Sequence, residues 1–393
     1  MKHLKDYFWS MACLLMMGAA MVSCDDDNND NGEPDGEETA SRVAYILYEG
    51  MGGYNNSGIA RFSPSGASDF VGNFFYTQNQ FGLGDTAMSF DEENGNLYCV
   101  VSGSKNVVRM DRNCVEQVRH SFDASEGAPR YLVVEDGYVY VTQYGGKVSK
   151  LDATTLEEVA SFKGGDNLEG IAEHNGKLYV ANAYKYDGGY VYHTEVLVID
   201  AASMQLDRSL EVTINPEILK EIDDKIFLIS RGDYGMVQPT LQVINPSDNS
   251  VSVIGNASKI TEGKNDRLYV LYSNTTYDEN WNATTVNTYF TYNHKPPIPA
   301  KGGNATTVNT YFTYNMQTGQ VENTSFLKNA PAELGSGNVY LLEMDEETEE
   351  IYVGLTDYVT NGTIYRFDGE GNLMETFDAG GINPNSVLFV END

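Results

Sequence analysis

Seven short apolar segments along the chain share one pattern, in which an aliphatic residue precedes Tyr or Phe and apolar and polar positions then alternate. The aromatic residues at this shared position are Tyr45, Tyr98, Tyr140, Tyr179, Phe227, Tyr269 and Tyr352. All but one of the intervals between them are 39 to 53 residues long. Alternation over so few residues predicts β-strands, and a strand that returns at this period is typical of a β-propeller.

Further strands flank each of these aromatic segments. The strand that follows ends in an apolar residue and usually Asp or Asn, whose short side chain initiates a turn, as at Asp111, Asp152 and Asp200. The strand that precedes begins near Pro, Gly or Asn, as in Ala128–Gly137 and Asn167–Gly176. With one more strand at the end of most units, each repeat is predicted to have four strands.

The two ends of the chain complement each other. The C-terminal segment Asn383–Asp393 has the form of a preceding strand, yet no aromatic segment follows it. The first aromatic segment, at Ala44, has no preceding strand of its own. Because closing the ring removes exposed sheet edges, the sequence predicts an all-β fold: a seven-bladed β-propeller of four-stranded blades over residues 41–393, closed by the C-terminal strand.

The one long interval, 83 residues between Tyr269 and Tyr352, contains a duplication. The sequence NATTVNTYFTYN occurs at Asn282–Asn293 and again at Asn304–Asn315, with a Pro-rich stretch between the copies. The second copy runs into a normal blade turn, so we expect it to be the strand of blade six. The first copy and its tail, residues 282–303, are expected to be an insertion or an extra edge hairpin, because Pro cannot join a central ladder. An eighth blade is the alternative.

The first forty residues have the features of a targeting segment and a tether. A short basic region precedes the apolar stretch Phe8–Val22, which is too short to span a bilayer stably. The sequence Met-Val-Ser before Cys24 resembles a bacterial lipobox, so residues 1–23 are predicted to be a signal peptide and Cys24 to carry lipid. The alternative is an ordinary signal peptide with an incidental cysteine. The acidic residues 25–40 are predicted to be a disordered tether.

The charge balance excludes some classes of partner. Lys and Arg number 25 against 57 Asp and Glu, a net charge of −32, whereas nucleic acids and anionic membrane surfaces need a basic face.

Two cysteines, Cys99 and Cys114, remain in the predicted fold. They are expected either to pair in an oxidising compartment or to remain half-buried thiols, and neither outcome makes a disulfide framework.

Tyrosines gather in the loops that follow the aromatic segments, and these loops share one predicted face of the ring. Tyr combines a large flat apolar area with a hydroxyl group and little rotamer entropy, so it is over-used at recognition surfaces. Although β-proteins are often tyrosine-rich, aromatics in at least five of the seven loops predict a binding mouth. The candidate ligand-binding residues are Tyr54, Arg130, Tyr144, Tyr184, Tyr186, Arg231, Tyr234, Tyr277, Trp281 and Tyr358.

Polar residues at the start of the innermost strands should reach the same mouth. They are Arg130, Glu169, Glu217, Lys259 and Asn385. We expect them either to orient a polar ligand or to form a solvated rim.

The five histidines show no ligand spacing for zinc. No carboxylate pair can be singled out as an acid–base couple, and no GxSxG or Gly-rich phosphate motif is present. The sequence therefore predicts a protein that is not an enzyme, with no metal site and no cofactor, although propellers also host catalysis.

With the lipobox, the acidic tether and seven blades, the chain resembles the YncE-like propeller lipoproteins of Bacteroides-type gut bacteria. The opening blade, Tyr48–Gly66, and the third-blade segment Ala128–Thr142 are similar to theirs. The BtuG-type members of this family capture vitamin B12 at the cell surface and pass it to a TonB-dependent transporter. The resemblance thus implies that a corrinoid binds at the mouth, with cobalamin as ligand rather than cofactor. No single cobalamin-contacting residue can be transferred.

These observations predict a surface-exposed, lipid-anchored protein of the outer membrane that captures a corrinoid and passes it to a TonB-dependent transporter. The acidic run after Cys24 also resembles the signal that sends lipoproteins to the cell surface in these bacteria. One alternative is a glycan- or protein-binding propeller of a surface nutrient-uptake system. Another is a propeller lactonase or lyase, which would need converging histidines and carboxylates, or a metal, at the mouth.

Overall fold

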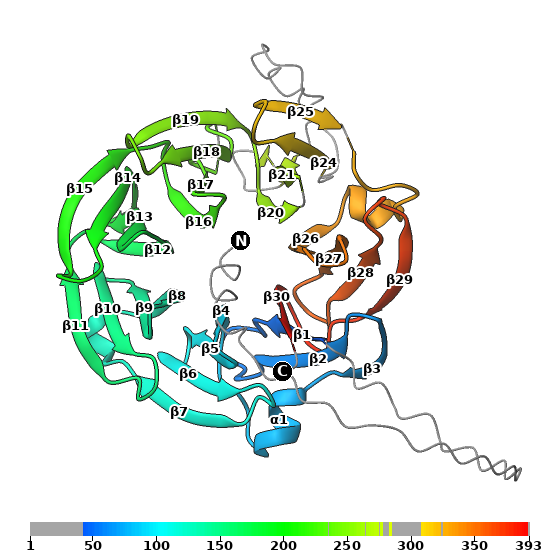
Figure 1. Ribbon diagram of the computed structural model, residues 1–393, viewed down its shortest axis with the longest axis horizontal. Helices are drawn as coiled ribbons and strands as arrows, with labels where there is room; N and C mark the ends of the chain where they lie inside the picture. Colours follow the sequence, from blue (N-terminus) through cyan, green and yellow to red (C-terminus); the bar gives the residue numbers. More distant parts are fainter. Residues whose placement is uncertain are drawn as a thin grey trace, which may run out of the picture.

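The computed structural model describes residues 42–391 apart from 235, 264, 275, 278–282, 285–307 and 324. Seven four-stranded antiparallel sheets of these residues are arranged around a ring as blades (Figure 1), and a two-stranded hairpin interrupts the sixth. This confirms the predicted seven-bladed propeller. Within the described ranges, no helix is both long enough and apolar enough to cross a membrane.

In each blade, the strands are given in order from the central channel to the outer edge. Blade 1 consists of β30 (Pro384–Glu391), β1 (Arg42–Tyr48), β2 (Gly58–Ser63) and β3 (Gly66–Val71). Blade 2 consists of β4 (Ala87–Glu93), β5 (Asn96–Val101), β6 (Asn106–Asp111) and β7 (Glu116–Ser121). Blade 3 consists of β8 (Pro129–Glu135), β9 (Tyr138–Gln143), β10 (Lys147–Asp152) and β11 (Glu158–Lys163). Blade 4 consists of β12 (Asn167–His174), β13 (Lys177–Tyr186), β14 (Tyr190–Asp200) and β15 (Gln205–Glu211).

The remaining blades follow the same order. Blade 5 consists of β16 (Pro216–Ile222), β17 (Lys225–Ser230), β18 (Thr240–Asn245) and β19 (Ser250–Gly255). Blade 6 consists of β20 (Lys259–Gly263), β21 (Arg267–Asn274), β24 (Val308–Asn315) and β25 (Gln320–Asn323). Blade 7 consists of β26 (Asn338–Asp345), β27 (Glu350–Thr356), β28 (Thr363–Phe367) and β29 (Leu373–Asp378). The other elements are α1 (Phe74–Asn79), two 3-10 turns (Ala124–Glu126 and Ala332–Gly335), and the hairpin strands β22 (Thr276–Tyr277) and β23 (Ala283–Thr284).

The aromatic residue of each repeat strand packs toward the next blade. Tyr98 on β5, for example, lies in one buried cluster with Val139 and Leu151 of blade 3. Its hydroxyl donates a hydrogen bond to the Ala153 carbonyl at 3.0 Å. Seven such clusters of buried residues each join two neighbouring blades. The core is therefore a ring of layers between blades, and the scaffold role predicted for these aromatics is confirmed.

The two chain ends close the ring. β30 pairs antiparallel with β1, from Arg42 opposite Glu391 to Tyr48 opposite Pro384, which confirms the predicted closure. Arg42 also joins blade 1 to blade 7, because its guanidinium donates two hydrogen bonds, of 2.7 and 2.8 Å, to the fully buried Asp345 carboxylate. Burial alone would raise the pKa of Asp345, but the hydrogen bonds and charge of Arg42 hold it below the ordinary value of 3.8.

The sixth blade uses the second copy of the duplicated sequence, as predicted. β24 lies in that copy and pairs with β21 along its whole length. Of the first copy, the structure describes only Ala283–Thr284, which pairs with Thr276–Tyr277 as a short hairpin. The rest of residues 282–303 lies outside the described residues, as do the predicted signal peptide, Cys24 and the tether.

The two cysteines of the fold lie in one buried cluster between blades 1 and 2. Cys99 and Cys114 are both free thiols in the structure. Burial raises the pKa of both thiols well above the ordinary value of 9.0. Of the two alternatives that the sequence left open, the structure therefore has the unpaired thiols, which are fully buried rather than half-buried.

Replacing Arg42 by Met would leave the buried Asp345 carboxylate without its cationic partner. We expect the free energy of unfolding at pH 7 to fall by about 3 kcal/mol, because removing one partner of a buried ion pair leaves the other charge unpaired. The pKa of Asp345 is depressed in the folded protein, so the stabilisation by Arg42 is present above pH 3.8 and is lost as the pH falls further. Urea unfolding at pH 7 and pH 3 should show a smaller wild-type advantage at pH 3.

Arg267→Met is the matched control, since Arg267 pairs with Glu322 at an exposed site. We expect that change to cost less than about 1 kcal/mol. Equal losses for the two variants, or an Arg42→Met effect that does not vary with pH, would contradict the role given to the buried pair.

Candidate functional site

The loops after the second strands and the segments that lead into the innermost strands share one face of the ring. Six tyrosines of blades 3, 4 and 5 meet on this face, and we call them the tyrosine cluster. Its members are Tyr144, Tyr184, Tyr186, Tyr190, Tyr192 and Tyr234. The ring centroids of contacting members lie 5.3 to 6.5 Å apart. The cluster is thus one continuous aromatic surface.

The length of the β13–β14 hairpin explains why four tyrosines of blade 4 come together. β13 has 10 residues and β14 has 11, against six in β17 of the next blade. Tyr184 pairs with Tyr192 across the hairpin, and Tyr186 pairs with Tyr190. Residues two apart on a strand share one face of the sheet, so all four rings stand on the same side. Tyr186 and Tyr190 are 69% and 63% exposed, as expected of a binding surface rather than a core.

A β-bulge recurs where the innermost strands reach this face. The register shifts near the first residues of β4, β8, β12, β16, β26 and β30. A bulge leaves a residue outside the ladder and re-aims its side chain. The residues at the shifts include Arg130, Glu169, Glu217, Tyr340 and Asn385. Arg130, Glu169, Glu217 and Asn385 are four of the five innermost-strand residues that the sequence assigned to the mouth.

An ion pair links the tyrosine cluster to the channel. Arg130 Nε donates to Glu169 Oε2 at 2.9 Å, and the Tyr144 hydroxyl donates to the other oxygen of Glu169 at 2.7 Å. The Arg130 guanidinium lies 4.8 Å from the centroid of the Tyr144 ring, within cation–π range. Burial raises the pKa of Glu169 despite Arg130, and burial together with Glu169 raises the pKa of Tyr144. Tyr144 is therefore held as a neutral hydrogen-bond donor.

A second ion pair lies on blade 5. Arg231 donates to both oxygens of Glu217, with Nε at 2.9 Å and Nη2 at 3.1 Å. Burial would raise the pKa of Glu217, but the charge and hydrogen bonds of Arg231 lower it. Tyr131 lies within electrostatic range of both ion pairs. The mouth thus contains a connected set of charges that are already paired with one another.

Lys259 is the exception to this pairing. It begins β20, and its Nζ lies 5.5 Å from the centroid of the Tyr340 ring. Among the described residues it takes part in no ion pair. Burial, followed by the charge of Arg231, lowers the pKa of Lys259 to about 8. Burial disfavours the charged form of such a lysine. Side chains whose pKa is shifted in this way are common at functional sites. Tyr340 in turn donates a hydrogen bond to Glu49.

Six of the ten candidate residues meet in this site. They are Arg130, Tyr144, Tyr184, Tyr186, Arg231 and Tyr234. Tyr358 lies apart from the tyrosine cluster, on blade 7, where its ring centroid is 6.0 Å from that of the mouth residue Tyr340. Tyr54 is 69% exposed in the β1–β2 loop and contacts no other described aromatic ring. Trp281 and the side chain of Tyr277 lie outside the described residues.

The sequence-based candidates missed four aromatic residues of the mouth. Tyr190 and Tyr192 complete the cluster from the second strand of its hairpin. The alternation of Tyr in residues 184–192 is the signal that would have found them. Tyr131 and Tyr340 sit at bulges of β8 and β26, and no sequence feature marks a bulge at these positions.

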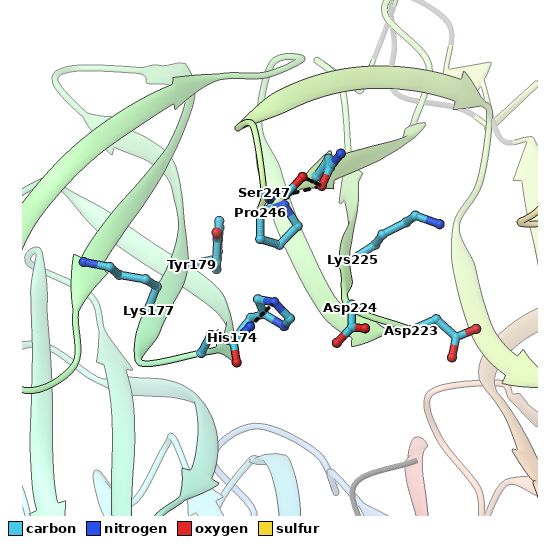
Figure 2. Close-up of a pocket in the computed structure, with 10 residues that line it drawn as sticks. His174, Lys177, Tyr179, Asp223, Asp224, Lys225, Pro246 and Ser247 are labelled. Atoms are coloured by element: carbon cyan, nitrogen blue, oxygen red, sulfur yellow. Dashed lines mark hydrogen bonds between the residues drawn. The ribbon is translucent and has the colours of Figure 1, made fainter.

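A surface cavity of about 490 Å³ lies on the opposite face, at the junction of blades 4 and 5. Its lining comes from the β12–β13, β16–β17 and β18–β19 turns and includes His174, Lys177, Asp224, Lys225 and Ser247 (Figure 2). These turns are at the other end of the strands from the tyrosine cluster. The cavity is therefore not part of the predicted mouth.

Comparisons with known proteins support the fold. No family model and no curated protein matches the chain. A functionally unknown protein from Desulfotomaculum acetoxidans superposes with a TM-score of 0.57 at 10% identity, over 89% of this chain and 99% of that one. Kuenenia stuttgartiensis hydrazine synthase gives 0.55 at 15% identity, over 78% and 94%. Such identities show the propeller fold alone, which is compatible with a binding role.

Replacing Lys259 by Met should stabilise the fold at neutral pH. The pKa of Lys259 falls from 10.5 to about 8 on folding, so the stability cost of its charge is complete below pH 8 and vanishes above pH 10.5. The side chain keeps some exposed surface, which reduces that cost, and we expect a gain of about 1–2 kcal/mol at pH 7. Urea unfolding at pH 7 and pH 10 should show a smaller gain at pH 10.

Lys328→Met tests the same change at an exposed position and should leave stability nearly unchanged. A Lys259→Met variant that is less stable than the wild type at pH 7 would refute the view that this charge is kept at a cost.

Proposed function

We propose that this protein is a non-catalytic capture protein that binds a large amphipathic small molecule of the corrinoid class at the channel mouth. The observation that carries the proposal is the tyrosine cluster, which continues through Tyr144 and Arg130 into the charged mouth. Its rings offer flat apolar contact, and its hydroxyls offer hydrogen bonds.

The chemistry of a corrinoid matches this surface. A corrinoid has a broad macrocycle, amide side arms and, in its nucleotide arm, a phosphate. Aromatic faces suit the macrocycle, tyrosine hydroxyls suit the amides, and the unpaired charge of Lys259 suits the phosphate. The side-chain oxygen of Asn385 in the mouth is buried without a hydrogen-bond partner, so it is free to accept from an amide. The resemblance of the sequence to corrinoid-capturing propellers supports the same class.

We propose that no catalysis takes place at the mouth. Arg130 is paired with Glu169, and Arg231 is paired with Glu217. The members of these two ion pairs hold one another, whereas general acid–base catalysis needs a group that is poised to exchange a proton with the substrate. Their arrangement suits the orientation of a ligand.

A glycan is the second candidate ligand, because Tyr186 and Tyr190 stand at the tip of a long hairpin. Both rings are more than half exposed, and such rings can stack on the apolar face of a sugar. A protein partner could use the same exposed surface. Both of these would place the protein in a surface nutrient-uptake system.

The proposed location is the outer surface of the outer membrane. Lipid on Cys24 would anchor the chain, and residues 25–40 would tether the propeller close to a TonB-dependent transporter that accepts the ligand. Holding the ligand near the transporter raises its effective concentration there. We expect Cys24→Ser to move the protein from the membrane fraction to the soluble fraction, measured by immunoblotting after ultracentrifugation. Retention of the variant in the membrane would contradict lipid anchoring.

Corrinoid binding can be measured by isothermal titration calorimetry with cyanocobalamin. We expect saturable binding, and we expect Tyr184→Ala and Tyr192→Ala each to weaken it at least tenfold, because buried aromatic contacts dominate small interfaces. Lys259→Met should also weaken binding while it stabilises the fold. Tyr76→Ala, on the exposed surface of α1, is the control and should bind normally.

No heat of binding at micromolar concentrations would reject the corrinoid assignment. Binding on a glycan array that is lost in Tyr186→Ala would then favour the second candidate. Unchanged affinity in Tyr184→Ala and Tyr192→Ala would show that a ligand, if bound, sits elsewhere.

A further inference from the structure

The turns of blades 4 and 5 bring a histidine and two carboxylates together on the face opposite the tyrosine cluster. His174 ends β12, Glu221 lies near the end of β16, and Asp224 lies in the turn before β17. One side-chain ligand atom from each lies within 4.8 Å of the other two. We call these three residues the His174 cluster.

Tight turns hold the His174 cluster in place. Asp223 and Asp224 have φ angles of 48° and 58°, and Asn175 and Gly176, which follow His174, have φ angles of 49° and 75°. Two consecutive left-handed residues are characteristic of two-residue hairpin turns. The innermost strands β12 and β16 also pack side by side. The three side chains are thus carried by rigid elements, as a binding site requires.

The hydrogen bonds of His174 allow two arrangements. Its Nδ1 lies 3.3 Å from Glu221 Oε1, and its Nε2 lies 2.7 Å from the side-chain amide of Asn175. If the Asn175 NH₂ donates to Nε2, then Nδ1 carries the proton and donates to Glu221. If the amide is turned, its oxygen accepts from Nε2–H, and the Nδ1 lone pair faces the Glu221 carboxylate. In that second arrangement Nδ1 is available as a ligand for a cation beside the carboxylates.

The second arrangement is the usual one at metal sites. A metal-binding histidine generally donates its other ring N–H to an oxygen acceptor, which fixes the ring and its tautomer. With its amide turned, the Asn175 side chain would be that acceptor. His174 therefore has both a facing set of ligands and a supporting partner.

Another junction between blades is stabilised without such a cluster. At the end of β4, Glu93 accepts a hydrogen bond from the backbone N–H of Gly137 in the next blade, at 3.4 Å. Between blades 4 and 5, an imidazole and a second carboxylate approach Glu221 instead. Closing the ring does not require this combination of groups.

We propose that His174, Glu221 and Asp224 bind a divalent transition-metal ion, with Zn²⁺ as the probe. One imidazole and two carboxylates are a donor set that suits Zn²⁺ and related ions. Three protein ligands leave coordination positions open. His174 and Asp224 also line the cavity of about 490 Å³ (Figure 2), so water or a small anion can reach the ion from there. The site is independent of any ligand at the tyrosine cluster.

Zn²⁺ binding can be measured by isothermal titration calorimetry on the full chain without a histidine tag, after treatment with EDTA. We expect one site per chain. His174→Ala, Glu221→Gln and Asp224→Asn should each weaken it at least tenfold. Asn tolerates the left-handed backbone at residue 224, so Asp224→Asn should fold normally. Asp136→Asn changes an acidic turn residue of blade 3 with a similar φ of 53° and should bind Zn²⁺ like the wild type.

Anomalous scattering from Zn²⁺-soaked crystals should place the ion among the three side chains. Diffuse binding to the many carboxylates of this acidic chain would instead give titrations that superimpose for the wild type and all three cluster variants. That result, or an ion located away from His174, would overturn the proposal. If His174→Ala fails to fold by circular dichroism, Asp224→Asn still decides the question.

Discussion

The antiparallel pairing of β1 with β30 is the constraint on which the rest of the structure depends. It joins residues from the two ends of the described chain, so that blade 1 is complete only when both ends are in place. Once blade 1 is complete, each blade packs against a neighbour on either side, and each of the seven apolar clusters is enclosed. The bidentate contact of Arg42 with Asp345 reinforces the junction at which the ring closes.

Closure also fixes the geometry of the two faces. Each innermost strand is held by its own blade and by its neighbours, so a bulge at its first residues presents a side chain at a defined place on the channel rim. Arg130, Glu169 and Glu217 come from three successive blades. Arg130 is hydrogen-bonded at 2.9 Å to Glu169 of the next blade, whereas Glu217 is hydrogen-bonded at 2.9 and 3.1 Å to Arg231 of its own blade. The repeated strands thus determine the scaffold, while the residues at the channel rim can differ from one blade to the next.

The sequence predicts the scaffold well because the physical cause of each feature is local. An aromatic residue in a short alternating strand must find a buried place, and in a ring that place is the next blade, as for Tyr98. The tyrosine cluster was also predictable in outline, because its hairpin is tyrosine-rich. The ten candidate residues did not include Tyr190, since loop position alone does not show which side chains face one another.

Pairings across blades are what the sequence could not supply. Arg130 meets Glu169 from 39 positions away, and His174 meets Glu221 from 47 positions away. Zinc-binding motifs are recognised by short spacings within one segment, so a cluster divided between two hairpins escapes that test. The sequence identified Lys259 as a residue of the mouth. It could not predict that Lys259 lacks an ion-pair partner among the described residues, because that depends on where the neighbouring blades place their carboxylates.

The two ends of the channel differ electrically although the whole chain is strongly acidic. Charges more than about 10 Å away are largely screened at physiological salt, so the local groups decide what each end attracts. At the tyrosine face, paired arginines leave the charge of Lys259 available to an anionic group. At the opposite end, burial raises the pKa of Glu262 to about 7, and the neighbouring carboxylates Glu346, Asp223 and Glu221 add to that rise. The anionic group proposed at one face and the cation proposed at the other are each consistent with these local charges, which the net charge of the whole chain does not show.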